Sequence, residues 1–143
     1  MKPAAILLSG GASRRMGRAK ATLPIGQETF LSRLVRVYTP WCQPIVVVLG
    51  EGHGAGEIQS AHAALPVTFV LNPQPERGMF SSLQTGLAAL APDRPVLFQP
   101  VDYPAISEDT IRLLAATDAP LAIPVYGGKH GHPIRLGPAL AAE

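Results

Sequence analysis

The sequence predicts an α/β fold, a three-layer α/β/α sandwich around a doubly wound, mostly parallel sheet. Short and almost wholly apolar runs recur along the chain, and segments with helical spacing of apolar residues stand between them. Apolar runs that do not alternate with polar residues are typical of strands covered on both faces, as in parallel sheets. Strands that alternate with helices predict β-α-β units wound into a single sheet.

The five apolar runs are the predicted strands. They are PAAILL, PIVVVLG, VTFVL, PVLFQ and PLAIPV, at residues 3–8, 44–50, 67–71, 95–99 and 120–125. With one helix between each pair, the predicted order is β-α-β-α-β-α-β-α-β.

The segments between the strands have apolar residues at helical spacing. The predicted inward faces are, in order, Phe30, Leu34, Val37 and Trp41; Ile58, Ala61 and Leu65; Phe80, Leu83, Leu87 and Leu90; and Ile111, Leu114 and Ala115. The fourth helix also has a start signal. Ser107 can cap it, and Glu108 and Asp109 place negative charge in the first turn, where the helix dipole favours it.

Composition predicts one domain, over residues 1–143, with a core of its own. The formal net charge of +2 is too small for a nucleic-acid-binding face. The apolar runs are far shorter than the roughly 18 residues of a membrane span. The single cysteine, Cys42, cannot form an internal disulfide, and the N-terminus lacks a signal-peptide pattern, so we expect a cytoplasmic protein.

The stretch LSGGASRRMGRAK, at residues 8–20, predicts an anion-binding loop. Ligands of doubly wound sheets bind beyond the carboxyl ends of the strands, and this stretch follows the first strand. Gly10 and Gly11 permit a sharp turn, and backbone amides in such a loop can point at an anion. Arg15 can fork onto phosphate oxygens, and Lys20 supplies a more mobile charge. A solvated turn is the alternative.

Two common phosphate loops do not match this stretch. The P-loop needs G-x-x-x-x-G-K-[ST], but Ala21 follows Lys20. The dinucleotide fingerprint needs G-x-G-x-x-G, which GGASRRMG lacks, and an acid that ends the second strand, where Gly50 stands. The anion therefore requires a different loop.

Four segments carry a resemblance to a known family. LSGGASRRMGRAKATLP resembles the signature L-[AS]-[AG]-G-x-S-x-R-M-G-x-x-K-x-x-L-P of the MobA-like nucleotidyltransferases, which include molybdenum-cofactor cytidylyltransferases and molybdopterin guanylyltransferases. Residues 72–87, 96–104 and 126–134 (NPQPERGMFSSLQTGL, VLFQPVDYP and YGGKHGHPI) resemble later segments of the family, in the same order. The G-M-x-x-S-L and G-H-P elements are typical of the cytidylyl branch, so the resemblance favours CTP over GTP.

The resemblance implies a Rossmann-like nucleotidyltransferase fold and a Mg²⁺-dependent enzyme. Such an enzyme transfers NMP, here CMP, from an NTP to a phosphorylated acceptor such as molybdopterin and releases pyrophosphate. Arg15, Lys20 and Asp102 would be catalytic, Asp102 would be the metal ligand, and His132 would lie on the acceptor side. The implied nucleotide-binding residues are Leu8, Ser9, Gly10, Gly11, Ser13, Arg15, Lys20, Asn72, Gly78 and Ser82.

Each of the later residues also has a structural interpretation. Asp102 could be a strand-end turn residue, Ser81 and Ser82 could cap the third helix, Asn72 could be a turn residue and His132 a hydrogen-bonded loop histidine. Met79 and Phe80 are interpreted as core or pocket lining. Where the family has glycine before the metal-binding aspartate, this chain has Val101.

The sequence ends at LGPALAAE, without the D-[IV]-D-x-P-x-D segment that supplies a second metal-binding carboxylate in the family. From this we expect either a naturally short protein or a C-terminally truncated domain. Two alternatives follow: a non-catalytic nucleotide-binding domain with a degenerate metal site, and an NAD(P)-linked oxidoreductase on a similar scaffold. The missing acids favour the first, and the missing dinucleotide fingerprint disfavours the second.

Overall fold

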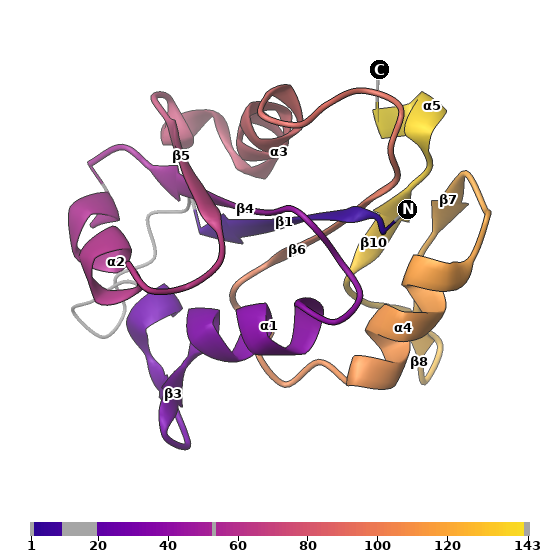
Figure 1. Cartoon of the computed structure of the whole chain (residues 1–143), viewed down its shortest axis with the longest axis horizontal. Helices are drawn as coiled ribbons and strands as arrows, with labels where there is room; N and C mark the ends of the chain where they lie inside the picture. Colours follow the sequence, from indigo (N-terminus) through magenta and orange to yellow (C-terminus); the bar gives the residue numbers. More distant parts are fainter. Residues whose placement is uncertain (1, 10–19, 53, 142–143) are drawn as a thin grey trace.

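The structure of the chain is a computed structural model, which describes residues 2–9, 20–52 and 54–141. A six-stranded sheet lies between two layers of helices, with α1, α2 and α4 on one face and α3 and α5 on the other (Figure 1). The helices are α1 (Phe30–Tyr38), α2 (Ala55–Ala61), α3 (Met79–Ala88), α4 (Glu108–Ala116) and α5 (Pro138–Ala141). The predicted three-layer sandwich is confirmed.

Four parallel strands form most of the sheet. The strands are β1 (Ala4–Ser9), β4 (Ile45–Gly50), β5 (Thr68–Asn72), β6 (Val96–Pro100), β7 (Leu121–Ala122) and β10 (Ile134–Leu136), in the spatial order β5-β4-β1-β6-β10-β7. The first four of these run parallel, and β10 is antiparallel to both of its neighbours. β1 therefore lies in the middle of the parallel part, between β4 and β6.

The last predicted strand, at residues 120–125, is wrong in its extent. Only Leu121–Ala122 joins the central sheet, as the edge strand β7. Val125–Tyr126 is β8 and pairs with β9 (Lys129–His130) in a separate hairpin. Pro124 stands between the two pieces, and a proline has no N–H to give to a ladder.

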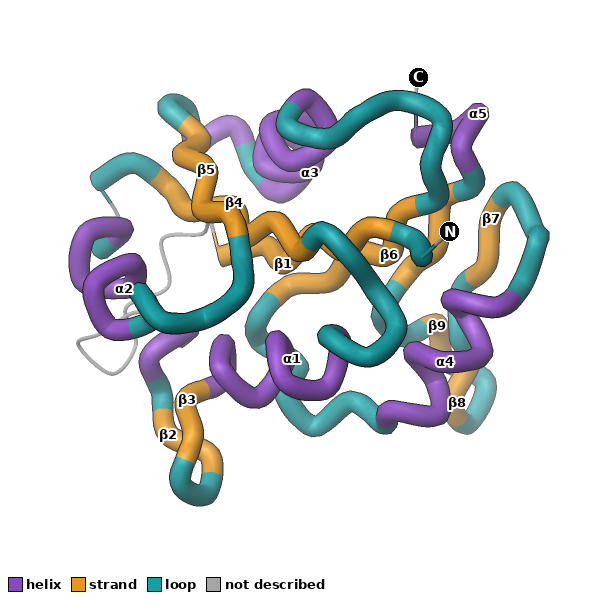
Figure 2. Tube along the Cα trace, viewed as in Figure 1, coloured by secondary structure: helices purple, strands orange, loops and turns teal. Residues whose placement is uncertain are grey.

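Short elements that the apolar pattern does not predict complete the chain. A second hairpin joins β2 (Pro24–Ile25) to β3 (Glu28–Thr29), and single turns of 3-10 helix form η1 (Lys20–Thr22) and η2 (Pro75–Arg77) (Figure 2). Each is two or three residues long, too short to show a period.

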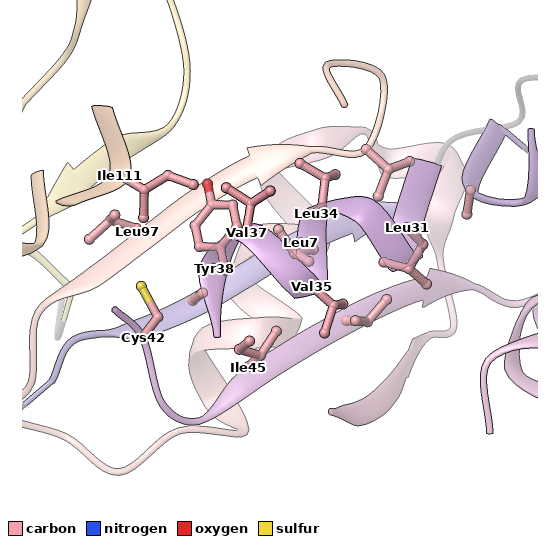
Figure 3. Packing of buried hydrophobic residues seen from close by; sticks show 14 of the residues in the cluster. Leu7, Leu31, Leu34, Val35, Val37, Tyr38, Cys42, Ile45, Leu97 and Ile111 are labelled. Atoms are coloured by element: carbon pink, nitrogen blue, oxygen red, sulfur yellow. The ribbon is translucent and has the colours of Figure 1, made fainter. Parts of the chain in front are cut away.

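Helix α1 packs into the larger of the two hydrophobic clusters of the core. It begins at a capping box, in which the Thr29 hydroxyl accepts from the Ser32 amide and the Ser32 hydroxyl accepts from the Thr29 amide. The buried side chains of α1 pack against side chains of the sheet, which include Leu7 of β1 and Leu97 of β6 (Figure 3). They are Leu31, Leu34, Val35, Val37 and Tyr38.

The predicted inward face of α1 is therefore wrong in part. Phe30 and Trp41 are only half-buried, and Trp41 lies beyond the last residue of the helix. Leu31, Val35 and Tyr38 fill the positions that face the sheet. The predicted residues Phe30, Leu34, Val37 and Trp41 lie along one side of the buried face of the helix rather than along its centre.

Helix α3 covers the opposite face of the sheet through Ser82, Leu83 and Gly86. Phe80, predicted to face inward, is 69% exposed, and Met79 is exposed as well, so neither is core. At 3.6 residues per turn, Phe80 lies about 115° from the centre of the buried face. It therefore points away from the sheet.

The two remaining predicted helices form with small differences. In α2, Ile58 is buried as predicted, while Ala61 is exposed and Leu65 lies after the helix ends. In α4, the Ser107 hydroxyl accepts from the Asp109 amide at 3.1 Å, so the predicted cap is confirmed. Its inward residues Ile111 and Leu114 are buried.

Candidate functional site

The site lies where the four parallel strands end. Their last residues are Ser9, Gly50, Asn72 and Pro100, and parallel strands place all these ends at one edge of the sheet. The segment predicted to bind an anion leaves this edge from β1, between β4 and β6. Doubly wound folds bind their ligands in such a place.

A backbone hydrogen bond joins the end of β1 to the turn after β6. Leu8 is paired with Pro100, and the Val101 amide donates to the Leu8 carbonyl oxygen at 3.0 Å. The next residue is Asp102, which is exposed. The fold thus places the predicted metal-binding aspartate beside the start of the cation-rich segment.

Most predicted residues of that segment lie outside the described part of the chain. These are Gly10, Gly11, Ser13 and Arg15. Leu8 is buried and Ser9 half-buried at the end of β1, and the backbone of Lys20 opens η1. The predicted contacts of Arg15 and Lys20 with phosphate stay predictions.

Asn72 and Ser82 meet in a buried network at the end of β5. Asn72 is 2% exposed, and its side-chain amide donates to the Ser81 and Ser82 hydroxyls at 2.9 and 3.0 Å. Its carbonyl oxygen accepts from the Gln74 amide at 3.0 Å. This network fastens the start of α3 to β5, so both residues have a structural role whatever else they bind.

Gly78, not a serine, is the N-cap of α3. Its φ of 97° lies in the left-handed region that favours glycine, and no atom of the described residues lies within 4 Å of the place of a Cβ. The interpretation of Ser82 as the helix cap is therefore wrong. Gly78 leaves open space beside the helix start, as the predicted close approach of a nucleotide requires.

A cleft of about 580 Å³ opens beside Asp102. It is lined by residues 102–107 and 130–132, so it joins the turn after β6 to the loop after β9. Tyr103 is exposed, and its ring is stacked on that of His132, with centroids 5.0 Å apart and planes 28° apart. The cleft therefore offers an aromatic surface next to the predicted metal ligand.

His132, for which the resemblance implies a place on the acceptor side, lines this cleft. The buried Nδ1 atom has no hydrogen-bond partner within the described residues, so the interpretation of a hydrogen-bonded loop histidine is not met at this atom. Burial lowers the pKa of His132 below its ordinary value, which favours the neutral ring. A neutral imidazole can accept a proton or a hydrogen bond from a ligand.

The carboxylate at this edge suits a metal ion that arrives with a nucleotide. Within the described ranges, no group of three or more His, Cys, Asp or Glu side chains could hold a metal ion. Mg²⁺ commonly binds through one or two carboxylates together with substrate phosphates and waters. Asp102 fits that mode and does not form a preassembled metal site with other described residues.

Two buried polar or reactive side chains, Cys42 and Arg135, lie away from the carboxyl edge of the sheet and have no part in the candidate site. Burial raises the pKa of Cys42 to about 12, so its thiol stays protonated and unreactive. Arg135 on β10 is 5% exposed and donates to the Leu114 and Ala119 carbonyl oxygens. It thus satisfies the carboxyl end of α4 and the segment that follows.

Sequence reasoning missed one polar residue of this region, Gln99. It is fully buried at the end of β6, and its side-chain amide is hydrogen-bonded to the turn that carries Asp102. A glutamine within the apolar run PVLFQ was the available signal.

The fold and the site define a class of protein, a doubly wound α/β domain whose predicted ligand site lies at the carboxyl edge of its sheet. The model of the MobA-like NTP transferase domain family matches residues 5–143. The chain belongs to this family, and the resemblance found in the sequence is confirmed.

Curated relatives of the chain have a more specific name. One from Mycobacterium avium is 35% identical over 137 residues and is named "Probable molybdenum cofactor guanylyltransferase". One from Mycobacterium tuberculosis, with the same name, is 33% identical over 135 residues. The matches cover 91% and 89% of this chain but 66% and 64% of the relatives, so the chain spans less than two thirds of their length.

Solved structures share the fold. Rv0371c from Mycobacterium tuberculosis superposes with a TM-score of 0.80 at 23% identity, over 99% of this chain and 75% of that one. A nucleotidyl transferase from Methanothermobacter gives 0.78 at 22% identity, over 97% and 73%. Molybdopterin-guanine dinucleotide biosynthesis protein A from Archaeoglobus fulgidus gives 0.66 at 20%, over 99% and 70%. The predicted nucleotidyltransferase fold is confirmed.

Two further expectations can be compared with these findings. The relatives' name refers to guanylyl transfer, so the expected preference for CTP is not supported. The family match leaves the NAD(P)-linked oxidoreductase without support. In the part of the chain that the structure describes, every helix is too short or too polar to cross a membrane.

Proposed function

We propose that this chain transfers a nucleoside monophosphate from a nucleoside triphosphate to the phosphate of a molybdopterin-type acceptor and releases pyrophosphate. The observation that carries the proposal is the hydrogen bond between the Val101 amide and the Leu8 carbonyl oxygen. It brings the start of the cation-rich segment and the turn with Asp102 to one point on the sheet edge. Family membership supports the class of reaction.

In this reaction an oxygen of the acceptor phosphate forms a bond to the α-phosphorus. The bond from that phosphorus to the bridging oxygen breaks, and its electron pair leaves with pyrophosphate. Arg15 and Lys20 would bind the outer phosphates and stabilise the leaving charge, and Asp102 would hold Mg²⁺. Mg²⁺ would supply Lewis-acid polarisation of phosphate oxygens when bound. Positioning and charge stabilisation dominate catalysis of phosphate transfer.

We propose GTP as the donor. The support is the name shared by the curated relatives, at 33–35% identity. The G-M-x-x-S-L and G-H-P elements had favoured CTP on resemblance alone. Competition binding with all four triphosphates tests the choice, and a clear preference for CTP would overturn it.

The acceptor is proposed to bind in the cleft that Tyr103 and His132 line. The cleft adjoins Asp102, and its aromatic surface suits a flat ring. This location leaves the opposite side of Asp102, toward β1, for the nucleotide. An acceptor phosphate and a donor phosphate could then meet at the carboxylate.

The test is pyrophosphate release from each labelled triphosphate with Mg²⁺ and purified molybdopterin cofactor. We expect release with the wild-type chain and a loss of at least about tenfold in Asp102→Asn, equivalent to about 1.4 kcal/mol or more. Asp93→Asn is the matched control. It removes the same charge from a residue that precedes the start of β6, whereas Asp102 follows the end of that strand, and asparagine tolerates the φ of 69° at position 93.

Two outcomes would contradict the proposal. Tight triphosphate binding without release would show the non-catalytic nucleotide-binding domain instead. Equal losses in Asp102→Asn and Asp93→Asn would show that the carboxylate of Asp102 has no special place in the reaction.

A further inference from the structure

The buried side chain of Gln99 is hydrogen-bonded to the backbone of the turn that carries Asp102. The carbonyl oxygen of this side chain accepts from the Tyr38 hydroxyl at 2.5 Å. Its amide nitrogen donates to the backbone carbonyl oxygens of Pro100 at 3.2 Å and Tyr103 at 3.1 Å. Both amide hydrogens and the carbonyl oxygen of Gln99 therefore have a partner.

The two hydrogen bonds from the Gln99 amide reach the backbone before and after Asp102. Pro100 precedes it by two residues and Tyr103 follows it directly, so a single side chain holds the backbone on both sides of the aspartate. The Val101 amide fixes the same turn to β1 through the Leu8 carbonyl oxygen. The turn is thus held from the core and from the neighbouring strand.

Helix α1 holds both this network and the far end of the turn. Tyr38, fully buried at the end of α1, binds Gln99, and the Arg33 Nε atom donates to the Pro104 carbonyl oxygen at 2.7 Å. The turn lies between two prolines, which have no N–H groups of their own. Side-chain donors therefore replace part of the hydrogen bonding that a backbone turn ordinarily supplies.

A buried amide is costly unless its polar atoms are hydrogen-bonded, and an apolar side chain of similar size would fill the same space without that requirement. A fully bonded buried network instead specifies one arrangement of the backbone around it. At Gln99 the arrangement specified is that of the turn from Pro100 to Tyr103, and the residue that this turn directs is Asp102.

We propose that Gln99 is a positioning residue that sets the direction of the Asp102 carboxylate, with Tyr38 fixing the side chain of Gln99. The proposal rests on the proposed function, in which Asp102 holds the metal ion. A displacement of about 1 Å at a reacting centre can cost about a hundredfold in rate, so the orientation of the turn matters to the reaction.

The experiment uses the full chain and Gln99→Met, which keeps the length of the side chain and removes its hydrogen bonds. Amide exchange is measured over Val101, Asp102 and Tyr103, and Mn²⁺ binding is measured by electron paramagnetic resonance with GTP present. We expect exchange about tenfold faster and Mn²⁺ affinity about tenfold weaker in the variant. At saturating Mn²⁺ the kcat falls, while the KM for GTP stays within about twofold.

Two further variants separate positioning from general instability. Tyr38→Phe removes one hydroxyl and leaves the ring in the core, and it should shift exchange and Mn²⁺ affinity in the same direction by a smaller factor. It also keeps the test open if Gln99→Met does not fold. Val35→Ala destabilises the same core without touching the turn, and should leave the exchange of these three amides and the Mn²⁺ affinity unchanged.

Unchanged amide exchange in both Gln99→Met and Tyr38→Phe would overturn the proposal, as would equal effects in Val35→Ala. Faster exchange with unchanged Mn²⁺ affinity would overturn it too, because the ordered turn would then not direct a metal ligand. A wild-type chain that binds no Mn²⁺ with any triphosphate refutes the proposed function. In that case the exchange comparison still decides whether Gln99 orders the turn.

Discussion

Gly86 permits helix α3 to lie close against the sheet, and Gly86→Ala is predicted to destabilise the fold. A Cβ at this position would lie 2.8 Å from Ile6 Cγ2, 3.1 Å from Ile6 Cδ1 and 3.1 Å from Val48 Cγ2. The Cγ2 atoms belong to β-branched side chains in central strands, which have little rotamer freedom. Either α3 or the strands must therefore shift.

The expected loss follows from two opposing contributions. Overpacking a core by one methyl group costs about 1–3 kcal/mol. Alanine in place of glycine inside a helix gains about 1 kcal/mol in helix propensity. With a contact as short as 2.8 Å to a branched side chain, we place the cost in the upper half of its range. The net prediction is a loss of about 1–2 kcal/mol in the free energy of unfolding.

Urea unfolding at 25 °C measures this change. With an m-value of about 2 kcal/mol/M, the unfolding midpoint should fall by about 0.5–1 M. Gly56→Ala is the matched control, because Gly56 lies in α2 and, in the described part of the chain, no atom lies within 4 Å of the place that the added methyl group would take. That variant should gain up to about 1 kcal/mol. A midpoint that rises in Gly86→Ala as it does in Gly56→Ala would refute the packing argument.

Two further predictions concern His132 and Asn72. Because burial lowers the pKa of His132, the unfolded chain takes up a proton below about pH 6.5 before the folded chain does, and stability falls as the pH falls. The urea midpoint, measured between pH 5 and 7.5, should depend less on pH in His132→Gln than in the wild type. His130→Gln changes an exposed residue and should keep the pH dependence of the wild type. The same pH dependence in wild type and His132→Gln would contradict the prediction. Asn72→Ala removes both bonds to the serine hydroxyls and the acceptor for Gln74, and should cost about 1–3 kcal/mol by urea unfolding. A midpoint equal to that of wild type would show that water replaces these bonds.

The strands, and the sheet edge at which the predicted anion-binding segment begins, could be predicted from the sequence because their signals are local. The runs that became β1, β4 and β6 are nearly all apolar and lie almost wholly buried, and a strand covered on both faces needs such a composition whatever its neighbours are. Ser107 followed by Glu108 and Asp109 marks the start of α4 because a helix cap acts within its own turn. The position of Asp102 after an apolar strand likewise implied the carboxyl edge of the sheet.

Tertiary structure alone decided the features that depend on partners distant in the chain. Leu31 and Tyr38, rather than Phe30 and Trp41, face the sheet, because the angle at which α1 lies on the strands selects the centre of its apolar face. The antiparallel strand β10 needs the edge of β6 to pair with, and three residues show no period of their own. Gln99 acquires its contact with the turn of Asp102 only when Tyr38, 61 residues away, supplies the hydroxyl that fixes its side chain. Hydrogen bonds and packing across such separations leave no periodic pattern in the sequence, since each partner is an ordinary residue until the fold brings the two together.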